Sequence, residues 1–135
     1  LPVLLMTGFA HEAIVREAAS LRQSGATVIV VAAHAGGRCT RFDDPRDLSS
    51  CDTSEAEIVR VIEQMPRGTV DLVASGHTHA GMAHEVDGTP VMQAFSGGAA
   101  FSRADLVIDR ETKKVIDKRV LPPRDLGARS RGHVA

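Results

Sequence analysis

Three histidines stand where the sequence could build a metal site. His34 follows the apolar run 28–33, and His77 and His79 follow a second apolar run, 70–74. In an extended segment the side chains at i and i+2 point to the same side, so His77 and His79 can face one region. Neutral imidazole is the commonest protein ligand for transition metals. Each histidine alone is typical of an ordinary surface or strand-end residue, but their combination predicts metal ligation.

Two buried strands are expected to position these imidazoles. Ala26–Ala33 is rich in Val and Ile without alternation, which is typical of a strand buried on both faces of a parallel sheet. Val70–Ala74 is the next such strand. A polar loop over Gly36–Thr53 and then a helix separate the two, and a crossover of this length predicts parallel neighbours with a right-handed connection. Ligands of open parallel sheets bind beyond the carboxyl ends of the strands, where the histidines lie.

Two helices are predicted from apolar residues at helical spacing. The first covers His11–Gln23, and the second begins at Ser54, where Ser54 and Glu57 have the form of a capping box. Their inward stripes are Ile14, Ala18 and Leu21 in the first helix, and Ile58, Ile62 and Met65 in the second. We expect Gly76 to let the backbone bend before His77, with Gly36, Gly37 and Gly81 giving similar freedom nearby.

The remaining chain has a residue pattern that is typical of short antiparallel strands. The candidates are Met82–Val86, Pro90–Phe95, Ala104–Ile108 and Val115–Leu121, with Leu1–Met6 as a possible edge strand. We therefore assign residues 1–121 to one domain and residues 122–135, which are polar and aperiodic, to a linker or tail.

Composition excludes some classes of function. The chain has 135 residues, 43% of them hydrophobic, and a formal net charge of -1. This balance gives no electrostatic reason to expect a nucleic acid polymer or an anionic membrane as a partner. The longest apolar run is too short to span a bilayer. Cys39 and Cys51 lie in one polar loop without a C-x-x-C motif, and both a disulfide and two free thiols stay open.

Three segments carry a family resemblance. "VIVVAAHAGG", "VDLVASGHTHA" and "TPVMQAFSGGAAFSRADLVID" resemble, in that order, motifs of the 5'-nucleotidase family of calcineurin-like metallophosphoesterases. The resemblance covers roughly Ala10 to Lys118 and corresponds to the C-terminal half of the catalytic domain. It implies an α/β fold, namely part of an αββα sandwich in which a parallel βαβ unit is followed by antiparallel strands.

The resemblance also implies a chemistry. Such enzymes hydrolyse nucleotides or related small phosphate esters with two divalent transition-metal ions, which can be zinc, manganese or iron. If the family's metal ligands are carried over to the matching positions of this sequence, His34 and His77 would bind one ion and His79 the other. The implied nucleophile is a metal-bound hydroxide, so no catalytic side chain is assigned. The family is commonly periplasmic or extracellular, which is compatible with a disulfide between Cys39 and Cys51.

The sequence departs from the family pattern in its missing ligands. The motifs D-x-H, G-D and N-H-[DE] are absent, and the chain contains no Asn. We therefore expect a processed or truncated fragment, inactive alone, which binds no ion or one ion weakly. Its partner would be the missing N-terminal half of its own domain, and exposed strand edges would favour self-association. Alternatives are a non-catalytic metal-binding or structural module, and a thiosulfate-ester or cyclic-nucleotide hydrolase.

Other polar residues allow two interpretations each. His84 could line the substrate mouth, or it could be a hydrogen-bonded strand histidine. Arg103 and the turn Ser96–Gly98 could approach a phosphate, or they could be a solvated charge and a tight turn. Asp43–Asp44 and Asp47 could ligate calcium, although a polar loop is the simpler interpretation.

Overall fold

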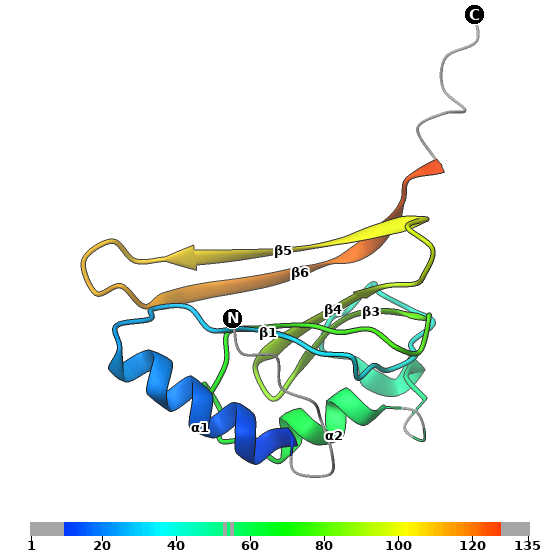
Figure 1. The fold of residues 1–135 in the computed structure, drawn as a ribbon. Coiled ribbons are helices and arrows are strands. Elements are labelled where there is room, and N and C mark those ends of the chain that lie inside the picture. Colours follow the sequence, from blue (N-terminus) through cyan, green and yellow to red (C-terminus); the bar gives the residue numbers. More distant parts are fainter. Residues whose placement is uncertain (1–9, 53, 55, 128–135) are drawn as a thin grey trace, which may run out of the picture.

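A four-stranded sheet lies between two helices on one face and a long β-hairpin on the other (Figure 1). The computed structural model describes residues 10–52, 54 and 56–127. The sheet has the strand order β1-β2-β4-β3. Its strands are β1 (Val30–Ala32), β2 (Leu72–Ala74), β3 (Gly81–Val86) and β4 (Thr89–Ala94). The other elements are α1 (Ala10–Gln23), α2 (Glu57–Glu63), the 3-10 turn Leu48–Ser50, β5 (Ala100–Ile108) and β6 (Val115–Asp125).

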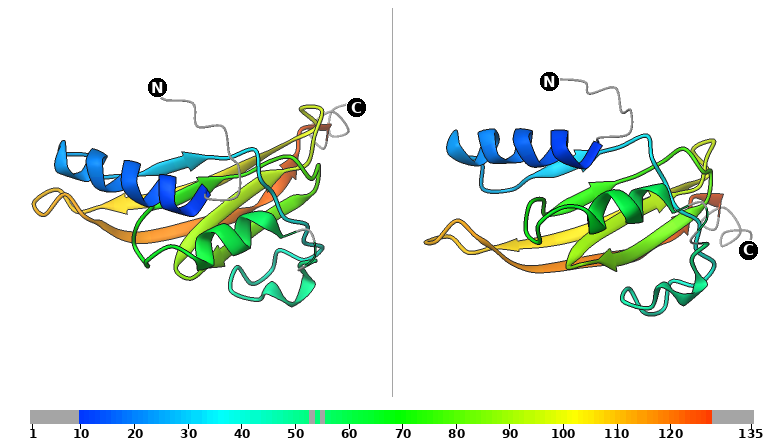
Figure 2. Two further views of the ribbon diagram at one scale, coloured as in Figure 1. Left: turned by 60° about the horizontal axis from the view of Figure 1, so that its bottom comes forward. Right: turned by 90° about the horizontal axis from the view of Figure 1, so that it is seen from below.

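The pairing of the strands confirms the predicted fold class. β1 pairs with β2 in parallel, with Val31 opposite Val73, and β2 pairs with β4 in parallel. β3 and β4 form an antiparallel hairpin, and β5 and β6 form a second one. Figure 2 shows both helices on the same face of the sheet. The chain is therefore a mixed α/β structure in which a parallel unit is followed by antiparallel strands.

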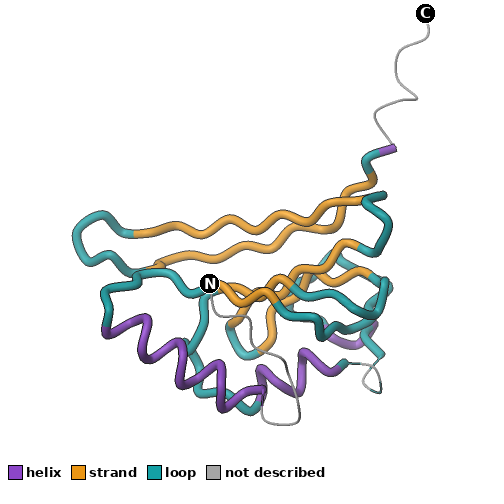
Figure 3. The backbone as a smooth tube through the Cα atoms, in the orientation of Figure 1, coloured by secondary structure: helices purple, strands orange, loops and turns teal. Residues whose placement is uncertain are grey.

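The core lies between α2 and the sheet, as the helical stripe predicts. Ile58 and Ile62 of α2 are 0% and 2% exposed, and they belong to the same buried cluster as Val73 and Val91 of the sheet. The stripe of α1 is less deeply placed: Ala18 is buried, whereas Leu21 is 50% exposed, so its predicted inward position is wrong. In the view from below, α1 lies beside β1 (Figure 2), and the tube representation shows both helices below the strands (Figure 3).

The prediction of a first strand buried on both faces is also wrong. β1 has only three residues, and Val30 is 53% exposed. Among the described residues β1 is an outer strand, because β2 pairs with it on one side only. The apolar run 28–33 therefore has more hydrophobic surface than the described neighbours cover.

The predicted capping box does not form. α2 begins at Glu57, and its N-cap residue Ala56 has no side-chain capping bond. The Ser54 hydroxyl instead donates to Asp52 Oδ1 at 2.6 Å. Ser54 therefore belongs to the loop that precedes the helix, where a short aspartate side chain satisfies it locally.

The last strand runs further than predicted. β6 continues through Pro122 and Pro123 to Asp125, which pairs with Ala100. Part of the segment expected to be a tail is therefore paired. The predicted strand Leu1–Met6 and the end of the chain, 128–135, lie outside the described residues. No helix in the described ranges is both long and apolar enough to cross a bilayer.

Candidate metal centre

His34 and His77 meet at the carboxyl ends of two neighbouring parallel strands. His34 follows β1 and His77 follows β2, and the Ala33 amide donates to the Ala74 carbonyl at 2.9 Å, which extends the pairing beyond the strands. His34 Nε2 and His77 Nδ1 lie 3.0 Å apart, and both side chains are exposed. The two histidines that the sequence analysis assigns to one ion therefore lie within contact distance of each other.

The spacing of the two nitrogens fits a shared ion. Two imidazole nitrogens on one tetrahedral zinc ion, each with a bond of about 2.0–2.1 Å, lie about 3.3 Å apart. The observed 3.0 Å between His34 and His77 is close to this value. Their rings are tilted by 58° with centroids 4.7 Å apart, so the pair is not a parallel ring stack. Two imidazoles are half of a tetrahedral coordination sphere.

His79 does not join this pair in the described structure. Across residues 10–52, 54 and 56–127, His34, His77 and His79 do not form a group with ligand atoms within 4.8 Å of one another. No carboxylate in these ranges completes such a group with His34 and His77 either. The assignment of His79 to a second ion remains a prediction.

Both histidines of the second motif have unusual backbone conformations. His77 has φ 82° and His79 has φ 54°, a region that residues other than glycine rarely adopt. Such strain costs of order 1–3 kcal/mol and gathers at functional sites. Gly76 is not in this region, so its predicted role as the bending residue is not supported, and the histidines themselves make the turn.

A buried glutamine holds the two histidine loops together. Gln93 of β4 is 2% exposed, and its Nε2 donates to Thr78 Oγ1 at 2.7 Å and to the Ala80 carbonyl at 2.8 Å. Thr78 Oγ1 donates in turn to the Gly37 carbonyl at 2.6 Å. Gln93 therefore links the loop after His34 to the loop that carries His77. Sequence reasoning missed it, although a lone amide in the apolar strand Thr89–Ala94 was the available signal.

Gly36 is required for space rather than for backbone freedom. A Cβ atom at Gly36 would lie 2.1 Å from the Gly76 carbonyl oxygen and 2.8 Å from Thr78 Oγ1. Both distances are shorter than real contacts allow, and the first is to a backbone atom that cannot move independently. The glycine therefore lets the two loops approach closely enough for His34 and His77 to meet.

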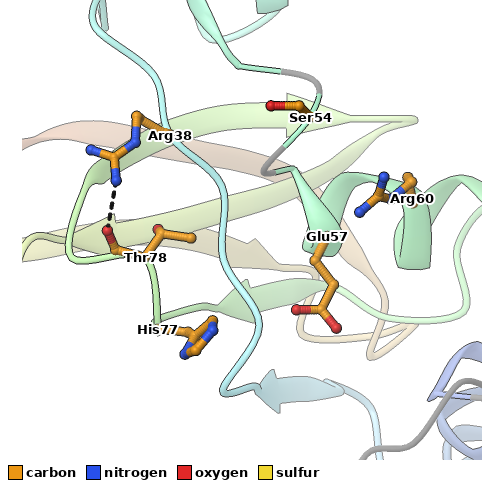
Figure 4. A pocket seen from close by; sticks show the side chains of 6 residues that line it. All are labelled: Arg38, Ser54, Glu57, Arg60, His77 and Thr78. Carbon is orange, nitrogen blue, oxygen red and sulfur yellow. Dashed lines mark hydrogen bonds between the residues drawn. The ribbon is translucent and has the colours of Figure 1, made fainter.

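A pocket of about 390 Å³ opens beside His77. Its lining residues are Arg38, Ser54, Glu57, Arg60, His77 and Thr78 (Figure 4). Arg38 Nη2 donates to the Thr78 carbonyl at 3.2 Å. Glu57 and Arg60 reach the pocket from α2 (Figure 4). The pocket thus combines one candidate metal ligand with two guanidinium groups and one carboxylate.

The structure places the other predicted site residues away from this pocket. His84 is 0% exposed within β3 and is not one of the lining residues, so the structure favours a strand histidine over a substrate contact. Arg103 donates to both carboxylate oxygens of Asp105, at 2.8 and 3.0 Å, which lowers the pKa of Asp105. The turn Ser96–Gly98 is exposed.

The polar loop satisfies its carboxylates internally. Asp47 accepts from the Ser49 amide at 2.8 Å, and hydrogen bonds from Ser49 lower its pKa. Asp44 accepts from the Arg46 amide at 2.9 Å. These bonds are those of an ordinary polar loop, and Asp43 is exposed beside them. Cys39 and Cys51 are joined as a disulfide across this loop, with their sulfur atoms 2.10 Å apart.

Comparison with known proteins identifies similar structures and sequences. The structure is similar to the crystal structure of a Staphylococcus aureus protein assigned as a 5'-nucleotidase, with a TM-score of 0.58 and 25% identity. That match covers 87% of this chain and 22% of the other. The sequence is 29% identical to the cell wall protein Lmo0130 of Listeria monocytogenes over 102 residues, which are 75% of this chain and 13% of the relative. No protein-family model matches.

These matches support a coarse description of the chain. Its fold resembles part of a 5'-nucleotidase domain, and the class of protein that this likeness suggests is a hydrolase. The chain spans only 13% and 22% of the two proteins it matches.

Proposed function

We propose that this chain is the part of a metal-dependent phosphoesterase that supplies His34 and His77 to one ion and His79 to a second. The substrates are nucleotides or related small phosphate esters. The remaining ligands, including the bridging carboxylate that the sequence lacks, come from another part of a longer protein. The observation that carries this proposal is the 3.0 Å separation of His34 Nε2 and His77 Nδ1 at the ends of two parallel strands.

The residues around His34 and His77 have different roles in the proposed site. His34 and His77 hold the ion, while Gln93 and Thr78 fix the spacing of the two loops. Arg38 and Arg60 provide positive charge in the adjacent pocket, where the anionic part of a phosphate ester would bind. When bound, divalent ions would activate water and neutralise charge on the phosphoryl oxygens.

A second candidate is a metal-binding module without catalysis. Its supporting observation is the ligand set: two imidazoles converge, and in the described ranges no carboxylate completes a group of three with them. A site of this kind could bind an ion and lack a bridging ligand. The two candidates differ in whether a longer protein containing this segment hydrolyses phosphate esters.

An extracellular or cell-surface location is part of the proposal. The cell wall protein of Listeria monocytogenes gives one reason, because it matches most of this chain. The Cys39–Cys51 disulfide gives another, because disulfides persist in oxidising compartments.

The direct test is hydrolysis by a longer protein that contains this segment. We expect metal-dependent release of phosphate from nucleoside monophosphates, and a loss of more than about hundredfold in kcat/KM for His77→Ala, because the ion that stabilises the transition state is lost. The matched control is His11→Ala, at the start of α1, where the side chain is half-buried. Cyclic nucleotides and thiosulfate esters belong in the same assay. A longer protein that binds metal and hydrolyses none of them would support the non-catalytic alternative.

The pocket can be tested in the same protein. Arg60→Ala should raise KM severalfold while kcat changes little, because Arg60 would contribute to substrate binding rather than to the metal site. Arg110→Ala, in the exposed turn between β5 and β6, serves as the matched charge control. An unchanged KM for Arg60→Ala would contradict the proposal that this pocket binds the substrate.

A further inference from the structure

A second cluster of metal-ligating side chains lies apart from the histidine pair. Cys39, Cys51 and His84 each offer a ligand atom, and these atoms lie within 4.8 Å of one another. Cys39 is 5% exposed and His84 is 0% exposed, whereas Cys51 is half-buried. The cysteines belong to the polar loop and His84 to β3, so the cluster joins the loop to the outer strand of the sheet.

His84 is poorly explained by packing alone. Its Nε2 atom is buried and has no hydrogen-bond partner among the residues that the structure describes, while its Nδ1 accepts from the Ala83 amide at 3.2 Å. An unsatisfied buried nitrogen costs about 1–3 kcal/mol, and such an atom in a native structure calls for an explanation, of which a bound ion is one. Met82 and Val86, two positions away on the same face of β3, are apolar core residues. An apolar side chain at position 84 would avoid the cost.

The surroundings of the His84 imidazole also suit a metal ligand. Desolvation by burial lowers the pKa of His84, and the backbone carbonyl of Arg41 and the charges of Asp47 and Asp44 oppose this shift only in part. One imidazole nitrogen with two sulfur atoms within 4.8 Å of it is a suitable donor set for a borderline-soft ion.

We propose that Cys39, Cys51 and His84 form a Zn²⁺ site when the disulfide is reduced. An external dithiol supplies two electrons and two protons, so the sulfur–sulfur bond breaks, two thiols form and the dithiol becomes a disulfide. Zn²⁺ then displaces both thiol protons to solvent, and a lone pair of His84 completes three protein ligands. The two thiolates neutralise the charge of the ion, which favours a buried site.

The dimensions of the cluster suit this change. Ligand atoms on a tetrahedral zinc ion, with bonds of about 2.0–2.3 Å, lie about 3.3–3.8 Å apart, within the present spread of 4.8 Å. The sulfurs must separate, while the loop stays attached to β3 through the Cys39 amide on the Gly81 carbonyl and the Glu85 amide on the Pro45 carbonyl. The loop would thus be closed by a disulfide in the oxidised chain and by zinc in the reduced chain.

A cobalt titration tests this site without involving the histidine pair. The His34→Ala/His77→Ala double variant is reduced with a dithiol, desalted without oxygen and titrated with Co²⁺. We expect one equivalent to produce thiolate-to-cobalt charge-transfer absorption, with no such absorption in the oxidised chain. Adding His84→Gln should weaken Co²⁺ binding at least about tenfold, whereas His11→Gln should not change it.

Each outcome of the titration either supports or overturns the zinc site. Absence of thiolate absorption in the reduced chain overturns the site, and so does absorption with unchanged affinity in His84→Gln, because the cysteines would then act without His84. If His84→Gln does not fold by circular dichroism, His84→Cys decides: retained binding supports the site and lost binding overturns it. Each result leaves the proposed phosphoesterase function untouched, since both of its paired ligands are already removed.

Discussion

At the scale of residues, the candidate centre depends on close approach more than on flexible glycines. His77 and His79 themselves adopt left-handed conformations, whereas Gly76 does not. Gly36 lies against the backbone of the neighbouring loop. The histidines could be proposed from sequence because candidate metal ligands have few alternatives in type and spacing. The roles of Gly36 and Gln93 could not be, because both depend on atoms of another loop.

Gly36 and Gly76 form a matched pair for testing this close approach. Gly36→Ala should lower the free energy of unfolding by roughly 1–3 kcal/mol, because its Cβ would lie 2.1 Å from the Gly76 carbonyl oxygen. Gly76→Ala should change it by less than about 0.5 kcal/mol, because the nearest atom to its Cβ is 3.9 Å away. Chemical denaturation measures both. Equal effects would show that the loops are not tightly packed at Gly36.

His84 makes stability depend on pH in a defined direction. Burial lowers its pKa below the ordinary value of 6.5, so as the pH falls through this value the unfolded chain binds more protons at this position than the folded chain does. The free energy of unfolding should therefore fall as pH is lowered from about 7 to about 5. The carboxylates with lowered pKa values act below their ordinary value of 3.8, outside this window.

The pH effect is measured by urea denaturation with a metal chelator present, so that ion binding does not contribute. His84→Gln should show a smaller decrease in unfolding free energy over this range than the unmodified chain. An equally steep decrease in the variant would mean that other groups cause it.

At the scale of elements, Asp71 connects α1, the approach to β1 and the hairpin. This aspartate is 6% exposed and lies immediately before β2. It accepts from Arg22 Nη2 at 2.6 Å and from the Ile29 amide at 2.9 Å, and Lys118 Nζ lies 3.7 Å away. A single carboxylate thus holds together elements that are far apart in sequence.

Removing this connection should be costly. Asp71→Ala should destabilise the chain by roughly 2–3 kcal/mol, because the buried Ile29 amide loses its acceptor and Arg22 loses its counter-ion. The control is Arg67→Ala, which removes the exposed ion pair with Asp87 and should cost less than about 1 kcal/mol. Thermal or urea unfolding compares them. A cost for Asp71→Ala no larger than that of the control would contradict the connecting role.

Elements were predicted well where periodicity alone decides them. The inward stripe of α2 and the alternation of parallel and antiparallel strands follow from local apolar patterns, and the structure confirms both. The start of α2 was misplaced, because Ser54 bonds to Asp52 instead of capping the helix. The exposure of Val30 was missed, because the burial of a strand depends on which segments pack beside it, and its own residues do not specify them.

At the scale of the whole molecule, the described chain leaves apolar surface uncovered. Ile116 and Val107 of the hairpin are 64% and 47% exposed, and Val30 lies on the outer strand β1. The chain spans only a small share of the two proteins it matches. We infer that the remainder of a longer protein covers part of this surface. In its absence an open strand edge is a template for pairing between copies.

Self-association of the isolated chain should therefore depend on its concentration. Sedimentation should show dimers or larger species that Val30→Lys reduces, because a lysine on an edge strand opposes strand pairing. Val107→Lys tests instead for association through the hairpin. A chain that stays monomeric over the whole concentration range would contradict the prediction.

The central claim is that His34 and His77 bind one ion together, and Zn²⁺ titration calorimetry of the oxidised chain tests it most directly. Oxidation keeps Cys39 and Cys51 in their disulfide, so the cysteine cluster does not contribute. We predict weak binding of about one ion and a loss of at least about tenfold in affinity for either His34→Ala or His77→Ala, with no change for His11→Ala. Unchanged Zn²⁺ affinity in both variants would contradict the claim.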